Sequence, residues 1–357
     1  MQYRTFGRTG WKVSEIGYGM WGMAGWTGSD DEESRGSLDR AVELGCTFFD
    51  TAWAYGDGRS EQLLGELLKR HPDKQLYTAT KIPPKNRKWP ARPEYPLADV
   101  FPSDYIREYT EISLRNLGTS SVDLQQFHVW DDSWAPDVSW QRAVTALKTE
   151  GLVKAIGISI NRWQATNVLK ALATDLIDSV QVVYNIFDQA PEDELFVECQ
   201  RRNIAVIARV PFDEGSLTGT LTADTTWPAG DFRNIYFQPE NLKNTLERVE
   251  KLRPVLDRVE LREPRERSHA NGAGLGAPAS ERVGESEGRS PSEKKMTLPE
   301  LALRHILAHP AVGTVIPGMR KQRHVEQNLA ASDGRPLAPA VLAELKGHRW
   351  DRWIDIP

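Results

Sequence analysis

Short apolar runs alternate with amphipathic segments along most of the chain. The runs with the length and composition of buried strands are 16–20, 47–50, 75–81, 122–128, 153–159, 179–185, 204–210 and 313–318. The amphipathic stretches that predict helices are 30–44, 60–69, 103–118, 140–151, 240–258 and 298–309. Strands that alternate with helices predict a parallel sheet, and eight such units predict a closed TIM (β/α)8 barrel of the α/β class. Ser60 is the expected N-cap of the second helix.

Two stretches do not follow this alternation. At the N-terminus, "YRTF" and "KVSEI" flank "GRTG", which predicts a β-hairpin that caps the barrel. Residues 262–295 contain few large apolar side chains and are rich in Gly, Ser, Glu, Arg and Pro, so they bury too little surface to offset the entropy of ordering. We expect a flexible insertion before the last barrel helix, within one domain that spans 1–357. A functional lid is the alternative for this insertion.

Composition narrows the class of protein and its partners. The 357 residues are 39% hydrophobic, and the net charge of -5 argues against nucleic acid or an anionic membrane as the main partner. Two cysteines, Cys46 and Cys199, form neither a disulfide framework nor a metal cluster, which favours the cytoplasm. The N-terminus lacks the apolar core of a signal peptide, and no apolar run approaches the ~18 residues of a membrane span. Whether the chain forms a homo-oligomer stays open.

Four polar residues stand at or just beyond the carboxyl ends of successive predicted strands. Asp50 ends "TFFD", Tyr55 follows in its loop, Lys81 ends "TATK", and His128 ends "QQFH". In a barrel these ends share one face, where active sites lie. Each residue alone is more often structural, as a turn, packing or satisfied polar group, but the four in this order favour a catalytic site.

The four side chains suit the protonation of an oxygen that gains negative charge. A phenol has a pKa of about 10 and is a weak acid, but an adjacent ammonium stabilises its anion. An aspartate keeps the ammonium charged and placed, and an imidazole can orient a carbonyl oxygen. Such a set fits hydride transfer to a carbonyl carbon, with a cofactor as the hydride source.

From "FGRTGWKVSEIGYGM" to "VIPGMRKQRHVEQNL" the sequence resembles the aldo-keto reductases, most specifically in "FFDTAWAYGDGRSE", "TATK" and "FH". The resemblance implies a TIM barrel, Tyr55 as proton donor assisted by Asp50, Lys81 and His128, and a small carbonyl compound as substrate. It implies NADPH or NADP+ as cofactor, bound without a Rossmann domain. The sequence accordingly has no G-x-G-x-x-G opening a βαβ unit.

The resemblance also implies cofactor contacts, with departures from the family pattern. Ile160 replaces the family's Asn beside Ser159, and Asn161 follows one residue later, so the second carboxamide contact stays open. Arg209 stands where the family has an aromatic residue that stacks on nicotinamide, and His324 stands where Gln is more common. The implied cofactor-binding residues are Met20, Trp21, Asp50, Ser159, Gln181, Arg209, Pro211, Gly215, Leu217, Gly219, Arg233, Gly318, Arg320, His324, Gln327 and Asn328.

Tryptophans recur in the loops that follow the strands. Trp21, Trp53, Trp89 and Trp130 are the predicted substrate-binding residues, because several indoles at one rim suggest an aromatic-lined pocket. Basic residues in the loop after Lys81 leave acidic substrates open. Two other functions stay open: a nucleotide-sensing regulatory subunit, like the channel-associated β subunits that resemble this family, and a barrel hydrolase or lyase. His128 argues against the first, since those subunits carry Asn there.

Overall fold

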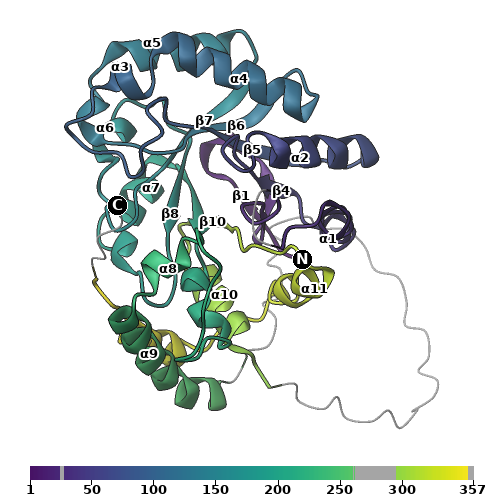
Figure 1. The fold of residues 1–357 in the computed structure, drawn as a ribbon, viewed down its shortest axis with the longest axis vertical. Helices are drawn as coiled ribbons and strands as arrows, with labels where there is room; N and C mark the ends of the chain where they lie inside the picture. The colour runs from purple at the N-terminus through teal and green to yellow at the C-terminus, as the bar shows by residue number, and fades with distance from the viewer. Residues whose placement is uncertain (25–27, 260, 262–294, 353–357) are drawn as a thin grey trace, which may run out of the picture.

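Eight parallel strands form a nearly closed barrel, which confirms the predicted TIM fold (Figure 1). The computed structural model describes residues 1–24, 28–259, 261 and 295–352. The barrel strands are β3 (Tyr18–Gly19), β4 (Phe48–Asp50), β5 (Tyr77–Ile82), β6 (Val122–Phe127), β7 (Val153–Ser159), β8 (Ser179–Val183), β9 (Ala205–Arg209) and β10 (Val312–Val315).

Each barrel strand pairs with its neighbours in the chain, in the order β10-β9-β8-β7-β6-β5-β4-β3. Isolated parallel bridges between Ile16 and Val315 and between Gly19 and Gly318 join the two ends of this sheet. All strands run in the same direction, so their carboxyl ends lie at one mouth of the barrel.

The helices surround the strands. They are α1 (Asp31–Glu43), α2 (Arg59–Arg70), α3 (Leu97–Val100), α4 (Ser103–Leu117), α5 (Val138–Thr149), α6 (Leu169–Leu172), α7 (Leu195–Arg202), α8 (Arg233–Tyr236), α9 (Pro239–Asp257), α10 (Leu298–Ala308), α11 (Gln322–Leu329) and α12 (Pro339–Lys346). Most of the buried apolar residues pack between this shell and the strands, where the apolar faces of the helices meet the outward side chains of the barrel. No helix among the described residues has the length and apolar character of a membrane span.

The amino-terminal mouth of the barrel is closed by the predicted hairpin. Strands β1 (Tyr3–Thr5) and β2 (Lys12–Ser14) pair antiparallel. Phe6 and Val13 are fully buried beside barrel residues such as Phe48 and Leu124. This apolar plug leaves the opposite mouth as the open end, where the candidate site lies.

One predicted helix cap is wrong. Ser60 does not cap α2, because the helix begins one residue earlier, after Gly58 in the left-handed conformation. The Ser60 hydroxyl is buried and meets the Thr51 hydroxyl at 2.7 Å. Ser60 therefore ties α2 to the end of β4.

The prediction for the insertion falls largely outside the described residues, which resume at Lys295. The single domain over 1–357 likewise stays a prediction.

Candidate active site

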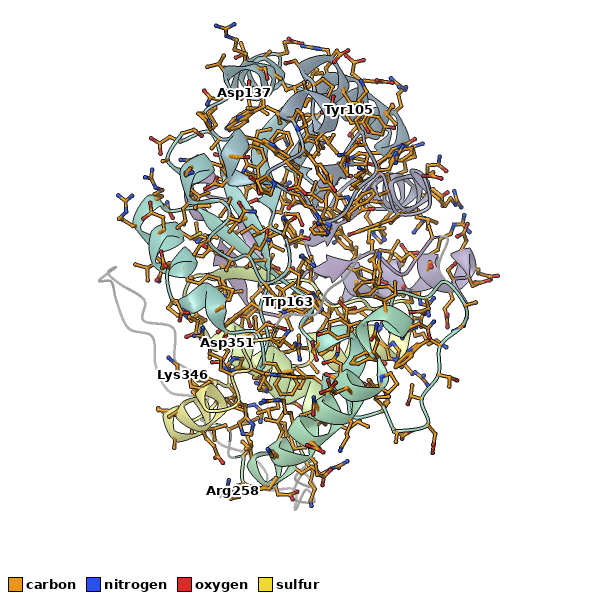
Figure 2. The ribbon with its side chains drawn as sticks, turned by 60° about the vertical axis from the view of Figure 1, so that its left-hand side comes forward. Tyr105, Asp137, Trp163, Arg258, Lys346 and Asp351 are labelled. Atoms are coloured by element: carbon orange, nitrogen blue, oxygen red, sulfur yellow. The ribbon has the colours of Figure 1, made fainter. Side chains whose placement is uncertain are left out.

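A cavity of about 1040 Å³ lies at the carboxyl ends of the barrel strands. Its wall includes residues from or just after six different strands: Met20, Asp50, His128, Ser159, Gln181 and Arg209. Loops complete the wall, among them the one that contains Trp163, which lies toward the centre of the molecule in Figure 2. Several residues that are far apart in the sequence thus share one chamber, as the strand-end pattern predicts.

Lys81 is the hub of the polar cluster at the inner end of this cavity. Its side chain is fully buried, and its Nζ donates to Asp50 Oδ1 at 2.5 Å and to the Thr51 carbonyl at 2.7 Å. A third contact goes to Tyr55 Oη at 3.4 Å. An ammonium has three N–H donors, so these acceptors use all of them and fix the side chain. The phenol oxygen accepts from Lys81, which leaves the phenol O–H to donate elsewhere.

The second oxygen of Asp50 is held by two glutamines. Gln126 Nε2 donates to Asp50 Oδ2 at 3.0 Å, and Gln181 Nε2 donates to the same oxygen at 2.8 Å. Asp50 is 2% exposed, and these bonds satisfy a carboxylate that would be costly to bury unpaired. Gln126 was not predicted, because its position within a strand resembles ordinary packing. Side chains two residues apart on a strand point to the same face, so Gln126 shares the face of His128. That spacing in "QQFH" is the signal that could have indicated Gln126.

The surroundings hold the phenol and the ammonium in their protonated forms. Burial raises the pKa of Tyr55, although the positive charge of Lys81 opposes this effect. Burial acts to lower the pKa of Lys81, but the charges of Asp50 and Tyr55 outweigh it and the pKa is raised. The sequence predicts that the ammonium stabilises the phenolate and so lowers the pKa of the phenol. Lys81 does act in that direction, but desolvation of the ring is larger.

His128 and Trp89 enclose the phenol from the side of the cavity. The imidazole packs edge-on against the Tyr55 ring with centroids 5.8 Å apart, and Trp89 lies edge-on to the imidazole at the same distance. Burial, with the charges of Lys81 and Arg209, holds the pKa of His128 well below its usual range, so it is neutral near pH 7. Its Nδ1 is buried and has no hydrogen-bond partner among the described residues.

Two arginines form the next layer of the cavity wall. Arg162 pairs with Glu214, and its guanidinium lies 4.7 Å from the centre of the Tyr236 ring. Arg209, at the end of β9, donates through Nη2 to the Ile160 carbonyl at 3.0 Å. Burial and the charge of Arg162 lower the pKa of Arg209 to about 10, so it stays charged at neutral pH.

The loop after β9 is held by an ion-pair network that the sequence did not predict. Asp213 accepts from Tyr236 Oη at 2.5 Å and from Ser216 Oγ at 2.8 Å, and it pairs with Arg352. Arg352 also reaches Asp188 at 3.3 Å. Asp213 and Glu214 adopt positive φ angles of 45° and 55°, which side chains other than Gly rarely do. This network joins the C-terminal stretch to the cavity wall and stabilises that backbone.

The amide of Asn161 is committed to the loop that contains Trp89. Its Nδ2 donates to the Ala91 carbonyl at 3.0 Å and to Gln164 Oε1 at 2.8 Å, and its Oδ1 accepts from Ala91 N at 3.3 Å. Asn161 thus joins two sides of the cavity, and both polar atoms of its amide have partners within the chain.

The outer end of the cavity is basic. Arg320, Lys321 and His324 line it at the start of α11, and Arg320 Nη1 donates to the Gly22 carbonyl at 3.3 Å. Backbone N–H groups at a helix start favour an anion, and the arginine adds charge. Arg233 also lines the cavity, and both Nε and Nη2 donate to Asp231.

Some predicted residues lie away from the cavity wall. Trp130 is fully buried and packs against Phe127, Trp134 and Trp140, because the chain turns it back into the shell of helices. Trp130 is therefore a core residue, and we leave it out of the substrate site. The other predicted residues outside the wall are Lys81, which reaches the wall residues Asp50 and Tyr55 from behind its surface, and Trp53, Leu217, Gly219, Gln327 and Asn328.

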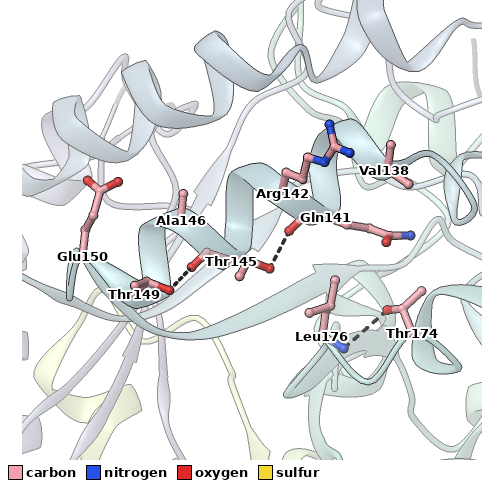
Figure 3. A pocket seen from close by; sticks show the side chains of 9 residues that line it. All are labelled: Val138, Gln141, Arg142, Thr145, Ala146, Thr149, Glu150, Thr174 and Leu176. Carbon is pink, nitrogen blue, oxygen red and sulfur yellow. Dashed lines mark hydrogen bonds between the residues drawn. The ribbon is translucent and has the colours of Figure 1, made fainter.

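A second hollow, of about 650 Å³, lies on the outer surface between α5 and the loop after α6 (Figure 3). Thr145 and Thr149 point their hydroxyls at carbonyls of their own helix, at 2.7 and 2.9 Å. Glu150, at the end of the helix, pairs with Arg107. These polar groups already bond to nearby groups of the chain, so the hollow does not resemble a catalytic centre.

A buried carboxylate and ammonium beside a half-buried phenol, at the open mouth of a TIM barrel, define a class of barrel protein equipped to transfer a proton. The family model described as "Aldo/keto reductase family" matches residues 15–349. The chain belongs to the aldo/keto reductase family, as the sequence resemblance predicted. Membership indicates an oxidoreductase that uses a nicotinamide cofactor and acts on a small carbonyl compound.

Relatives agree on the family but differ in cofactor. The chain is 30% identical over 253 residues to "Aldo-keto reductase yakc [NADP(+)]" of Schizosaccharomyces pombe, covering 68% of this chain and 72% of the relative. It is 26% identical over 338 residues to the "NADH-specific methylglyoxal reductase" of Escherichia coli, covering 91% of each. The holo form of an aldo-keto reductase from Bacillus halodurans superposes with a TM-score of 0.70 at 25% identity, covering 99% of this chain and 97% of the other.

The cavity fits a nicotinamide dinucleotide. Its basic outer end suits phosphates, and its inner end presents buried polar atoms without partners among the described residues, namely His128 Nδ1, Arg209 Nε and Arg162 Nη1. Such atoms suit the polar edge of a ligand that would otherwise leave them unsatisfied.

Proposed function

We propose that this protein is an NADPH-dependent oxidoreductase that interconverts an aldehyde or ketone with an alcohol, with Tyr55 as proton donor. The observation that carries the proposal is the contact of the buried Lys81 ammonium with both Asp50 and Tyr55. Tyr55 would be an acid whose anion forms beside the fixed positive charge of Lys81. The cavity beside it is large enough for cofactor and substrate.

In this mechanism the substrate carbonyl oxygen accepts a hydrogen bond from the Tyr55 hydroxyl. As negative charge develops on that oxygen, the phenol proton moves to it, and the phenolate left behind is stabilised by the adjacent Lys81 ammonium. Asp50 holds Lys81 in place. Neutral His128, packed against the phenol, would donate a second hydrogen bond to the substrate oxygen.

The bound cofactor supplies the hydride for the carbonyl carbon. Of the proposed cofactor-binding residues, Ser159 and Gln181 would hold the nicotinamide end. Arg209 flanks that end, and Met20, Trp21 and Gly318 complete the wall beside it. The proposed phosphate end comprises Pro211, Gly215, Arg233, Arg320 and His324.

NADPH is proposed over NADH because of the basic start of α11. Arg320 can make a bidentate, charge-assisted contact to the extra phosphate, and 318–325 contain no acidic residue to hold a ribose diol instead. The expected discrimination is roughly one to two powers of ten in Kd, from about 1.5–3 kcal/mol for such a contact.

The test is to titrate the protein with NADPH and NADH by nicotinamide fluorescence, in wild type, Arg320→Ala and Arg323→Ala. Arg323 is exposed in the first turn of α11, three residues after Arg320, and is absent from the cavity wall, so it is the matched control. Arg320→Ala should weaken NADPH binding and leave NADH binding nearly unchanged. Equal losses for both cofactors would show that Arg320 supports the loop instead of binding the phosphate.

Turnover is measured with a panel of aldehydes and ketones at saturating NADPH. If the protein binds NADPH tightly but no substrate oxidises the cofactor, the proposal of an enzyme is contradicted. That result would support the alternative of a nucleotide-sensing subunit. No binding of either cofactor would support an unrelated barrel hydrolase or lyase.

A further inference from the structure

We propose that the substrate is an aldehyde or ketone that also carries a carboxylate, and that Arg209 binds this carboxylate. The proposal rests on the proposed function and names the substrate class of the same site. It starts from the charges of the cavity wall, where Arg209 differs from its basic neighbours.

The other inner cations of the cavity already have counterions. Lys81 is paired with Asp50 at 2.5 Å, and Arg162 is paired with Glu214. Arg209 has no carboxylate within ion-pair distance among the described residues. Its hydrogen bond to the Ile160 carbonyl uses Nη2 alone, and its buried Nε has no partner there. A guanidinium has five N–H donors, so most of the N–H groups of Arg209 are left for a ligand.

Arg209 lies close to the reacting atoms. Arg209, Tyr55 and His128 line the same cavity, and the positive charge of Arg209 acts to lower the pKa of both Tyr55 and His128. A substrate whose carbonyl oxygen is bonded to Tyr55 would therefore extend within reach of Arg209.

The missing counterion must come from the substrate. Arg209 is half-buried, and Glu214 and Asp50 act on its charge without forming an ion pair with it, so an anion that arrives with the substrate would remove the remaining cost of its burial. The nicotinamide ring is neutral when reduced and positive when oxidised, so it cannot neutralise Arg209. The phosphates of the cofactor have their own basic residues at the outer end, including Arg320 and Lys321. A carboxylate also matches the planar fork of an arginine in shape.

The carboxylate takes no part in the bond changes. The carbonyl carbon receives the hydride from the nicotinamide cofactor, the carbonyl oxygen receives the proton from Tyr55, and solvent later returns a proton to the phenolate. The product is a hydroxy acid and the cofactor is oxidised by two electrons. Binding of the carboxylate places the carbonyl for this step and contributes to the choice of substrate.

The experiment compares substrates in matched pairs in which a methyl group replaces the carboxylate. The pairs are 4-carboxybenzaldehyde with 4-methylbenzaldehyde, and 4-oxobutanoate with butanal, each at saturating NADPH. Wild type should show a kcat/KM that is about 10- to 100-fold higher for the charged member, the range that one charge-assisted hydrogen bond provides. Arg209→Met should abolish this ratio, and Arg209→Lys should keep part of it because the charge remains without the fork.

The ratio within each pair cancels any effect of Arg209 on the cofactor. Arg142→Met is the matched control, because Arg142 is exposed and lines the outer hollow beside α5 instead of the cavity. It should leave the ratio unchanged. A second measurement does not need turnover. It compares the affinities of 4-methylbenzoate and its amide for the NADPH complex, measured by the fluorescence of the bound NADPH.

The outcomes separate the two proposals. Wild type that reduces neither member of a pair contradicts the proposed function. Wild type that reduces both members equally well overturns this inference and leaves the proposed function intact. An Arg209→Met variant that loses activity toward both members by the same factor would assign Arg209 to the cofactor alone.

Discussion

Tyr55 combines two properties that oppose each other at the scale of a single residue. Burial favours its protonated form, which is the form an acid needs, while Lys81 favours the phenolate that forms after the proton has left. In the proposed mechanism, the phenol therefore stays protonated until negative charge develops on the substrate oxygen. A solvent-exposed phenol would lack both effects, since water would screen the ammonium.

Replacement of Tyr55 by Phe removes the transferable proton and keeps the ring. We expect kcat for carbonyl reduction to fall by roughly 10²–10⁴, the usual scale for general acid catalysis, with NADPH affinity nearly unchanged. Tyr109→Phe is the control, because this phenol accepts a bond from Arg87 at a surface position. The measurement is single-turnover oxidation of NADPH. Near-complete activity in Tyr55→Phe would remove Tyr55 from the mechanism.

Lys81→Met should destabilise the protein and abolish activity together, because it leaves the Asp50 carboxylate buried without its cation. The expected loss of unfolding free energy is about 3–5 kcal/mol. Adding Asp50→Asn removes the orphaned charge, and the amide can still accept from Gln126 and Gln181. Urea unfolding should therefore show partial recovery of stability in the double variant while turnover stays absent. Equal stability of the single and double variants would contradict a charged pair.

Sequence reasoning located the residues that end strands and missed those that act from within strands or from distant segments. Asp50, Lys81 and His128 follow apolar runs, so their position at one face follows from the barrel. Gln126 lies inside a strand, where a polar residue has no pattern that separates it from packing. Trp130 was placed at the rim because loops are usually exposed, but its loop folds inward onto a cluster of tryptophans.

At the scale of elements, the loop after β9 depends on contacts from three other parts of the chain. Arg352 comes from near the C-terminus, Tyr236 from α8, and Arg162 from the loop after β7. None of these contacts has a local sequence signal, because each joins residues far apart in the chain. The barrel strands were predictable for the opposite reason, since each is a short apolar run with its own periodicity.

Arg352→Ala should loosen this loop. It leaves Asp213 with its bonds from Tyr236 and Ser216 but without its cation, so we expect a loss of about 3 kcal/mol in unfolding free energy, near the lower end for a broken buried pair. Because Glu214 and Gly215 line the cavity, NADPH should dissociate faster, as measured by stopped-flow fluorescence.

Arg349→Ala is the matched control for Arg352→Ala. Arg349 pairs with Asp193 and Asp351 at the surface, where ion pairs contribute about 0–1 kcal/mol. Its effect on both stability and cofactor release should be small. If the two variants release NADPH at the same rate, the Asp213 pair does not hold the cavity wall.

At the scale of the whole molecule, the buried His305 makes the free energy of unfolding depend on pH. His305 on α10 is 4% exposed, lies beside Tyr184, and has no hydrogen-bond partner for either ring nitrogen among the described residues. Burial lowers the pKa of His305 from 6.5 to about 4. The folded state therefore binds its proton less readily than the unfolded state does. The stability that His305 contributes is complete above the unfolded pKa of about 6.5 and is lost as pH falls toward 4.

His305→Leu should flatten this dependence, because leucine fills a similar volume and does not titrate. With pKa values of about 6.5 unfolded and 4 folded, His305 accounts for about 2 kcal/mol of the stability lost between pH 7.5 and pH 5. Urea unfolding of wild type and variant at both pH values measures the difference directly, and the contributions of the carboxylates cancel in the comparison. The variant should gain relative to wild type at pH 5. An unchanged pH dependence would mean that the His305 ring is protonated, or reaches water, in the folded protein.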